Sequence, residues 1–386
     1  MNHFQWEGYL RKDGRKGIRN YIVVVYNTEC THHVARAIAS PFKDHPVQLI
    51  NMAGSNLNDN SDIMMNAICM HPNVGAVLLV ASGSEGFDFN KLEGQVNQSG
   101  RPVNKIVIQE AGGTQKAIDA GLDWVDWCLG IVDIAFMVPM TVDDLIIGTI
   151  SGGSDATTGV TANPALGRAC DKLISNNATV IFQETGEMIG LEAVLIDRAA
   201  NPAISEHLKR SLENAASNYR LIDNESIVPG NASGYLTTDA EKSMSIYCKV
   251  GGSQISGLIK PGEKPSRPGL YLMDVNPGDK SVRALVSKNV SVGIVEMIAS
   301  GCHMIIFTTG SGSVVGSAIS PVIKICSNPQ TYERMKGDMD INAGDILHGE
   351  ITIEKMGNNI CDGILAVAAG IPTCSEGMGH QEFMLT

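Results

Sequence analysis

The sequence predicts an α/β protein with two Rossmann-like parallel-sheet domains, each with helices on both faces of its sheet. Short apolar segments recur along the chain and alternate with segments of helical pattern, an order typical of parallel sheets. The apolar segments are continuous runs, such as GAVLLVA at 75–81, as expected of strands buried on both faces. The 41 glycines predict many tight turns and many places where bare backbone can approach a ligand.

The first domain is predicted at residues 1–140. Its expected strands are 21–26, 47–50, 76–81 and 104–108. Its expected helices begin near residue 31 and cover 60–70, 87–97 and 114–128. Residues 131–150 hold two apolar segments around Pro139, and we expect the chain to cross between the domains there.

The second domain is predicted at residues 141–386 and has the same α/β character. Its expected strands are 178–183, 269–274 and 303–309. Its expected helices begin near residue 163 and cover 186–219, 237–247 and 350–368. The segment 222–235 reads as a loop, and the tail after Pro372 is expected to be loop-like and either mobile or at a subunit contact.

Composition excludes several classes of function. The net charge is −12 and no basic run is present, which argues against a nucleic-acid partner. The most basic stretch, 11–19, is interrupted by Asp13 and Gly14, so we interpret it as a local anion site or a solvated loop. The apolar runs are too short to span a membrane, and no secretory signal is visible. The nine cysteines include no CxxC pair and suggest free thiols in a reducing compartment, so we expect a cytoplasmic protein.

Ligands of parallel sheets bind beyond the carboxyl ends of the strands, so the polar residues after each predicted strand are the candidate site. After 21–26, Cys30, His32 and His33 supply types suited to metal binding or proton transfer. The alternative is a capped helix start with solvated histidines. After 76–81, the segment 82–86 offers free N–H groups and Glu85 as a metal ligand, or else a simple turn.

The second domain offers four more candidates. The segment 151–155 combines bare backbone, hydroxyls and a carboxylate, which suits carboxylate or metal binding. After 178–183, Glu184 and Glu187 suit acid–base work or metal ligation, or else simply start a helix. The turn 310–316 resembles the GxGxxG dinucleotide motif, but its third glycine comes one residue late. We therefore interpret it as an anion-binding turn and not as a dinucleotide site. The stretch 338–350 offers oxygen ligands or helix caps.

Several motifs in sequence order resemble the altronate/galactarate dehydratase family. The motifs are GYLRKDGRKGIRNY at 8–21, GGSD at 152–155 with TANPALG at 161–167, PGN at 229–231 with LTT at 236–238 and EKS at 241–243, FTTG at 307–310, and DMDIN at 338–342 with GDI at 344–346. The likeness runs from about residue 7 to 370.

The resemblance implies a lyase that catalyses metal-assisted β-elimination (dehydration) of a sugar acid or related 2-hydroxy acid to a 2-oxo acid. The family uses a divalent metal, typically iron. It also includes the large subunit of a (2R)-sulfolactate sulfo-lyase, which expels sulfite instead of water. Members carry a small SAF-type domain or use a separate small subunit bearing it, so a SAF-domain subunit is an expected partner, and we expect a homo-oligomer.

One departure from the family pattern concerns cysteine. Dehydratase relatives place cysteines in several of these motifs, whereas the matching positions here are Ser55, Ser84, Ser151, Ser317 and Ala343, and only Cys30 is kept. A hydroxyl is a poor ligand for a soft metal. We therefore expect a divalent ion, Fe²⁺ with Mn²⁺ or Mg²⁺ as alternatives, and no iron–sulfur cluster.

The chemistry assigns provisional roles. A base removes the proton next to the carboxylate, and a metal or a set of N–H donors stabilises the enediolate. The expected catalytic residues are His32, His33, Glu184 and Lys242. The expected substrate-binding residues are Arg15, Arg19, Ser151, Gly152, Gly153, Ser154, Asn163, Thr308, Thr309, Gly310 and Ser311. The expected metal ligands are Cys30, Glu85, Asp155 and Glu187.

Three alternatives stay open at this point. The first is the sulfo-lyase reaction. The second is a non-catalytic subunit that binds a sugar acid, which the retained acidic and histidine residues at the strand ends argue against. The third is a nucleotide-binding oxidoreductase, which the misplaced third glycine disfavours.

Overall fold

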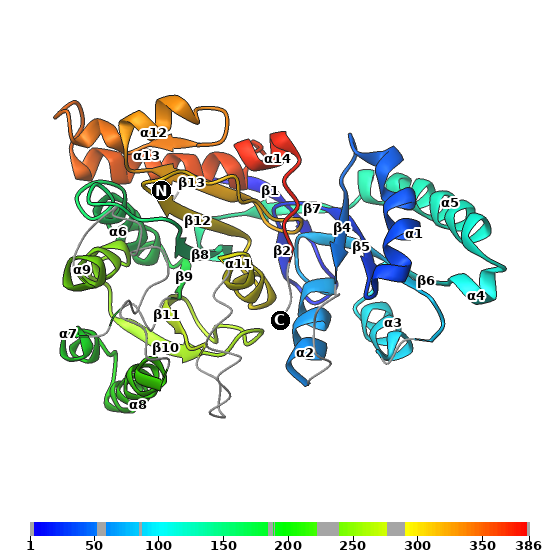
Figure 1. Cartoon of the computed structure of the whole chain (residues 1–386), viewed down its shortest axis with the longest axis horizontal. Helices are drawn as coiled ribbons and strands as arrows, with labels where there is room; N and C mark the ends of the chain where they lie inside the picture. Colours follow the sequence, from blue (N-terminus) through cyan, green and yellow to red (C-terminus); the bar gives the residue numbers. More distant parts are fainter. Residues whose placement is uncertain are drawn as a thin grey trace.

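The computed structural model describes residues 4–51, 59–84, 87–183, 188, 190–221, 239–275 and 290–383. It contains two parallel sheets joined by a small antiparallel sheet (Figure 1). Both large sheets carry helices on their two faces, which confirms the predicted fold class.

The first parallel sheet has four strands in the order β4-β3-β5-β6. They are β3 (Tyr21–Tyr26), β4 (Val47–Asn51), β5 (Val74–Ala81) and β6 (Val103–Val107). One face packs on α1 (Glu29–Ala39) and α5 (Thr114–Asp133), and the other on α2 (Asp59–Cys69) and α3 (Phe89–Gln98). Alternate side chains of β3 point to opposite faces, so Ile22 and Val24 join one core and Val23 and Val25 the other.

The second parallel sheet has seven strands in the order β10-β11-β9-β8-β12-β13-β14. In chain order they are β8 (Ile146–Ser151), β9 (Thr179–Phe182), β10 (Ile255–Ile259), β11 (Gly269–Met273), β12 (Met304–Thr309), β13 (Val322–Cys326) and β14 (Ile341–Asn342).

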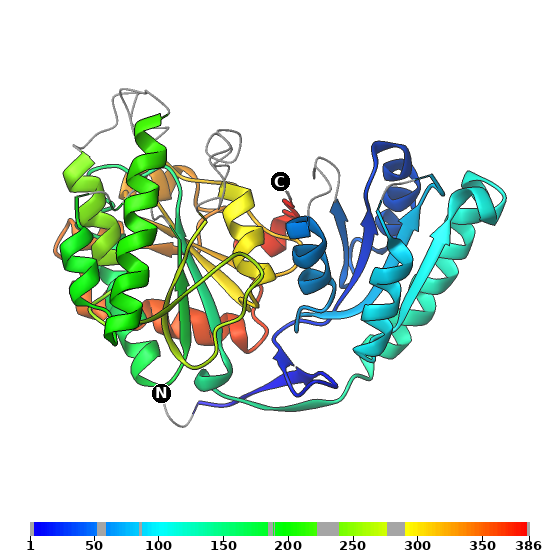
Figure 2. The ribbon, with the colours of Figure 1, turned by 90° about the horizontal axis from the view of Figure 1, so that it is seen from below.

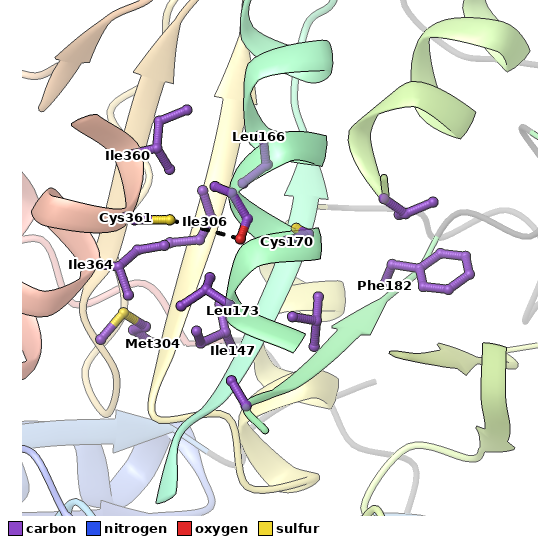
Figure 3. Packing of buried hydrophobic residues seen from close by; sticks show 14 of the residues in the cluster. Ile147, Leu166, Cys170, Leu173, Phe182, Met304, Ile306, Ile360, Cys361 and Ile364 are labelled. Atoms are coloured by element: carbon purple, nitrogen blue, oxygen red, sulfur yellow. Dashed lines mark hydrogen bonds between the residues drawn. The ribbon is translucent and has the colours of Figure 1, made fainter. Parts of the chain in front are cut away.

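Helices of the second half divide between the two faces of this sheet. One face packs on α6 (Ala162–Ser175), α7 (Glu192–Asp197), α8 (Pro202–Leu221), α9 (Asp239–Lys249) and α13 (Ile353–Ala368). Figure 3 shows the centre of this core, where Leu166 and Leu173 lie near Ile306 and Ile364. The other face packs on α11 (Val290–Ala299).

A three-stranded antiparallel sheet links the halves. Its strands are β1 (Trp6–Leu10), β2 (Lys16–Gly17) and β7 (Met137–Met140), in the order β2-β1-β7. Figure 2 shows this sheet along one side of the molecule, where the chain passes from one half to the other. The sequence did not predict it, since β1 and β7 are short and pair over more than a hundred residues.

The two halves also share a core. Helix α2 packs against α11 (Figure 2). Apolar side chains from both helices lie in one buried cluster. Two buried histidines bridge the halves: His71 Nε2 lies 3.1 Å from the Cys302 carbonyl oxygen, and His303 Nε2 lies 2.8 Å from that of Lys16. The pKa of both histidines is lowered chiefly by burial, and that of His303 falls to about 4.

Two features differ from the sequence prediction, and a third prediction is not tested. The tail after Pro372 is not only loop: it forms α14 (Cys374–Met378), capped by Thr373, whose hydroxyl accepts from the Glu376 amide while the Glu376 carboxylate accepts from the Thr373 amide. The predicted helix 186–219 is two helices, α7 and α8, and Pro202 begins the second. The predicted loop 222–235 lies outside the described residues.

Other elements are shorter. They are α4 (Ile108–Ala111), α12 (Pro329–Arg334) and the 3₁₀ turns η1 (Ser40–Phe42), η2 (Val142–Asp144) and η5 (Gly344–Ile346). Within the described part of the chain, no helix is long and apolar enough to cross a bilayer. All nine cysteines are free thiols.

Candidate active site

The candidate site lies at the carboxyl edge of the seven-stranded sheet. Strands β8, β12 and β13 are neighbours and run parallel, so the loops that follow them meet at the same edge. The sequence placed its glycine- and hydroxyl-rich segments there, and the structure brings 151–155 and 308–311 together. The remaining question is which of their polar groups are open to a ligand.

The two loops hold each other through the Gly153 carbonyl. This oxygen accepts from the amide N–H groups of Gly310 (2.9 Å) and Ser311 (3.2 Å) and from the hydroxyls of Thr309 and Ser311 (each 3.2 Å). The Gly152 amide donates to the Thr308 carbonyl at 2.9 Å. The amides expected to cradle an anion at 310 and 311 are therefore committed to joining the two loops.

The glycines of these loops are required by close packing. A methyl group at Gly152 would collide with the Phe307 ring, and one at Gly310 would collide with the Asp155 carboxylate. Ser154 donates weakly to the Gly152 carbonyl at 3.4 Å. The GGSD and FTTG motifs therefore provide the small residues that the close packing of these two loops requires.

Asp155 organises the loop that follows β8. Its Oδ1 accepts from the backbone N–H groups of Thr157 (2.9 Å) and Thr158 (3.2 Å) and from both of their hydroxyls. Its Oδ2 accepts from Asn328 Nδ2 at 3.2 Å. A carboxylate that accepts this many hydrogen bonds stabilises the loop conformation. Most of its lone pairs are occupied by these donors, which leaves little capacity for coordinating a metal.

A buried cation stands behind Ser151. Lys249, the last residue of α9, is fully buried, and its Nζ donates to Ser151 Oγ at 3.0 Å. Ser151 Oγ lies 3.0 Å from the Thr308 hydroxyl, while Ser151 itself is partly exposed. The Lys249 amine, the Ser151 hydroxyl and the Thr308 hydroxyl therefore form a continuous series of hydrogen bonds at the sheet edge.

Sequence reasoning missed Lys249. A lysine in the last turn of a helix ordinarily complements the helix dipole in solvent, so nothing in the local pattern marks it as buried. The sequence analysis predicted a catalytic role for Lys242, which lies in the EKS motif. Lys249 lies seven residues further along the same helix, and this proximity in sequence to the motif is the one signal that pointed to it.

Asn163 lies at the start of α6 and is fully buried. Its Nδ2 donates to the hydroxyl (2.8 Å) and the carbonyl (3.2 Å) of Ser245. The side chain thus fastens α6 to α9, the helix that carries Lys249. Its Oδ1 is buried with no hydrogen-bond partner among the described residues.

The first-domain candidates lie on the other sheet. Cys30 and His33 are exposed in the first turns of α1, after β3. His32 stacks on Tyr26, with ring centroids 5.2 Å apart. These residues stand at a carboxyl edge as expected, but on the four-stranded sheet and not among the loops around Ser151.

The two arginines predicted to bind substrate have protein partners. Arg19 pairs with Glu376 of α14 (2.7 and 3.1 Å) and donates to the carbonyls of Val367 and Ile371. Burial raises the pKa of the Glu376 carboxyl, but the hydrogen bond and charge of Arg19 outweigh it, so the pKa is lowered. Arg15 binds Asp13 (2.6 Å) and the Met70 carbonyl (2.7 Å).

Four predicted residues are not tested by the structure. Glu85, Glu184 and Glu187 lie outside the described residues, as does the side chain of Lys242. Among the side chains that are described, no three of the types His, Cys, Asp and Glu converge on a point where a metal would sit. The described residues therefore do not by themselves form a metal centre.

Comparison with known proteins decides the family. The model "D-galactarate dehydratase/altronate hydrolase, second domain" matches residues 8–133, and "D-galactarate/altronate dehydratase, C-terminal" matches residues 142–386. The chain belongs to this dehydratase family. Its members include lyases of two kinds, and the relatives below represent both.

Three curated relatives are similar over nearly the whole chain. A (2R)-sulfolactate sulfo-lyase subunit beta from Chromohalobacter salexigens is 30% identical, over 98% of this chain and 96% of its own length. The altronate dehydratase of Escherichia coli is 28% identical, over 98% of this chain and 76% of its own. The altronate dehydratase of Bacillus subtilis is 27% identical, over 95% of this chain and 74% of its own length. The dehydratases thus have further sequence beyond the shared part.

Proposed function

We propose that this chain is a lyase that eliminates water from a sugar acid or related 2-hydroxy acid and yields a 2-oxo acid. Membership of the dehydratase family and the names of the altronate dehydratases support the reaction class. The structural observation that carries the proposal is the buried Lys249 ammonium behind the partly exposed Ser151 hydroxyl.

In this proposal the negative charge of the elimination develops next to the Ser151 hydroxyl, with the Lys249 ammonium beyond it. Loss of the C2 proton converts the substrate carboxylate and C2 into an enediolate, and the C3–O bond then breaks as hydroxide leaves with its electron pair and is protonated. The resulting enol gains a proton at C3 and becomes the 2-oxo acid. Fixed hydrogen-bond donors at an enediolate oxygen are the kind of group that lowers this barrier.

Ser151 is the donor in this proposal and Lys249 is its positioning residue. Ser151 Oγ accepts from Lys249 and lies 3.0 Å from the Thr308 hydroxyl, and in this proposal it donates its own proton to a substrate oxygen. The positive charge behind it strengthens that donation as the enediolate forms. Lys249, which is fully buried, acts through the serine and not by direct contact.

The base and the metal remain proposals. His32, His33 and Glu184 have side chains suited to removing the proton, and Lys242 to holding an anionic end. A divalent ion, Fe²⁺ or alternatively Mn²⁺ or Mg²⁺, would act as a Lewis acid at the enediolate. The described residues do not assemble a set of ligands for this ion.

Turnover is the test of the proposed function. The chain is assayed anaerobically with iron(II), and in parallel with manganese(II), against aldonates, aldarates and 3-sulfolactate, with any separate small SAF-domain subunit supplied. Formation of 2-oxo acid without sulfite is the expected result. Binding of a sugar acid without turnover, with metal demonstrably bound, would replace the proposal with the binding-subunit alternative.

Three variants test the role of Lys249. K249M is expected to lower kcat by about a hundredfold, as is typical when one stabilising group is lost, with a smaller change in KM. K249R restores part of the rate because it keeps the charge, and S151A reproduces the loss without touching the lysine. K336M, at an exposed lysine, is the matched control. An unchanged kcat in both K249M and S151A would remove this pair from the mechanism.

A second candidate is the sulfo-lyase reaction, in which the C3–S bond breaks and sulfite leaves with the electron pair. It is favoured by one observation: the likeness to the sulfolactate sulfo-lyase subunit extends over 96% of that relative. That relative is named as a subunit beta, so this reading includes a partner subunit. Equal amounts of 2-oxo acid and sulfite from 3-sulfolactate would decide for it.

A further inference from the structure

A cavity with a cationic lining lies at the amino edge of the four-stranded sheet, away from the strand ends at which His32 and Cys30 lie. Its volume is about 330 Å³. The lining includes Arg11, Lys12 and Arg101 together with Asn20 and Pro102, which directly precede β3 and β6. This volume is near the lower end of the range for small-molecule sites, roughly 300–1,000 Å³.

Two of its guanidinium groups are buried and form no ion pair with any residue that the structure describes. Arg11 is 9% exposed and donates to the carbonyls of Pro72 (2.6 Å) and Arg19 (3.2 Å). Arg101 is 5% exposed and donates to the Val74 carbonyl (2.9 Å), two further carbonyls and a serine hydroxyl. Neutral carbonyls satisfy donors but do not balance charge, and the nearby Asp13 carboxylate offsets the two positive charges only in part.

Asp13, the carboxylate that acts electrostatically on both arginines, is already paired with another residue. Oδ2 of Asp13 accepts from Nε (2.9 Å) and Nη2 (2.6 Å) of Arg15. Arg15 adds a third guanidinium group to the same region. Burial, and then repulsion between the two arginines, lowers the pKa of Arg11 to about 9. Burial, with repulsion from Arg15, lowers the pKa of Arg101 to about 10.

One donor of this cluster is left over. Nη1 of Arg11 has no hydrogen bond to any described residue, and Lys12 lies at the rim with its stem against Gly100. Apolar side chains complete the rim: Ile131, Ile134 and Leu10, of which Ile134 is 83% exposed. The cavity lining thus combines an excess of positive charge with apolar side chains, within a chain whose net charge is −12.

We propose that this cavity is a binding site for a small oxyanion carrying two negative charges, separate from the candidate active site. Oxyanions bind where guanidinium and ammonium donors converge with uncompensated charge. Inorganic sulfate or phosphate and a short organic dicarboxylate share this chemistry. They differ in whether carbon atoms reach the apolar rim.

Calorimetric titration of the full chain tests the site without any measure of turnover. Sodium sulfate, phosphate and malonate are titrated at matched ionic strength, with chloride as the reference anion. The wild-type chain is expected to bind at least one of the three dianions with a single site. Tighter binding of malonate than of sulfate points to an organic ligand, and the reverse order to an inorganic one.

Two variants locate the binding. K12E reverses the charge at the rim and is expected to weaken binding by at least about tenfold, while A135F fills the cavity and abolishes binding without altering any charge. K336E makes the same charge change on an exposed lysine of the other half and is the control. Circular dichroism checks that each variant is folded. The proposal is overturned if the wild type gives no saturable heat, or if K12E and A135F bind the anion as tightly as the wild type does.

Discussion

The two buried histidines that bridge the halves make stability depend on pH in a window that can be calculated. His303 Nδ1 accepts from the Ile146 amide at 3.0 Å and Nε2 donates to the Lys16 carbonyl at 2.8 Å. Only the neutral ring can do both, because the protonated ring has no acceptor. Burial in addition disfavours the charge, and the folded-state pKa is about 4 against 6.5 in the unfolded chain.

The sign follows from proton binding. Between these two pKa values the unfolded chain binds a proton that the folded chain does not, so the free energy of unfolding rises with pH there. The stabilisation is fully present above 6.5, falls as the pH drops below 6.5, and changes no further below about 4. Lowering the pH from 7.5 to 5 costs about 2 kcal/mol from His303 alone. His71, whose pKa is lowered in the same way, adds to this loss.

Urea denaturation at a series of pH values from 7.5 to 4.5, followed by far-ultraviolet circular dichroism, measures the slope. H303N keeps an acceptor for the Ile146 amide but cannot titrate, so it is expected to be less stable at pH 7.5 and to show a shallower slope. H33N, at an exposed histidine, is the matched control and should keep the wild-type slope. A wild-type slope retained in H303N would refute the reasoning.

The remaining predictions concern single contacts. R19M leaves the largely buried Glu376 carboxylate without its partner (15% exposed side chain), and we expect a loss of about 3–5 kcal/mol in urea denaturation, with R19K as the milder comparison. A loss below about 1 kcal/mol would show that the pair behaves as a surface contact. G152A forces a methyl group into a neighbouring ring and should cost about 1–3 kcal/mol, whereas G94A, with open space around it, should be neutral or stabilising. Equal effects of the two glycine substitutions would contradict the packing argument. K249M, as designed above, should lower kcat while the denaturation midpoint stays close to wild type.

The parallel strands were predictable because they are buried on both faces. β3 and β5 read as unbroken apolar runs, and every residue in each is buried. β13 escaped prediction for the opposite reason: Lys324 stands in its middle, fully buried, and a charged residue interrupts the apolar pattern. The strand is fixed by tertiary contacts, such as the Lys324 amide donating to the Asp340 carboxylate at 2.7 Å.

Long-range pairing also separates what the sequence predicts from what it does not. Arg19 was assigned to substrate because the N-terminal motif is rich in cations, and its partner Glu376 lies 357 residues away in a tail expected to be loop. No local pattern could join them. The topological rule that ligand loops follow parallel strands needs no such knowledge, and it placed Ser151 and Thr308 at one edge correctly.

The motif after β8 shows how one residue pattern serves two needs. Glycines, hydroxyls and a carboxylate at 151–155 suggest a ligand site, yet Gly152 and Asp155 are the types that two closely packed loops require. Loops with this many internal hydrogen bonds are rigid, and rigidity is what an electrostatic catalyst needs in its donors. The loop residues would therefore serve the proposed chemistry by holding Ser151 in place against Lys249, a charged residue of α9, which carries no part of the 151–155 motif.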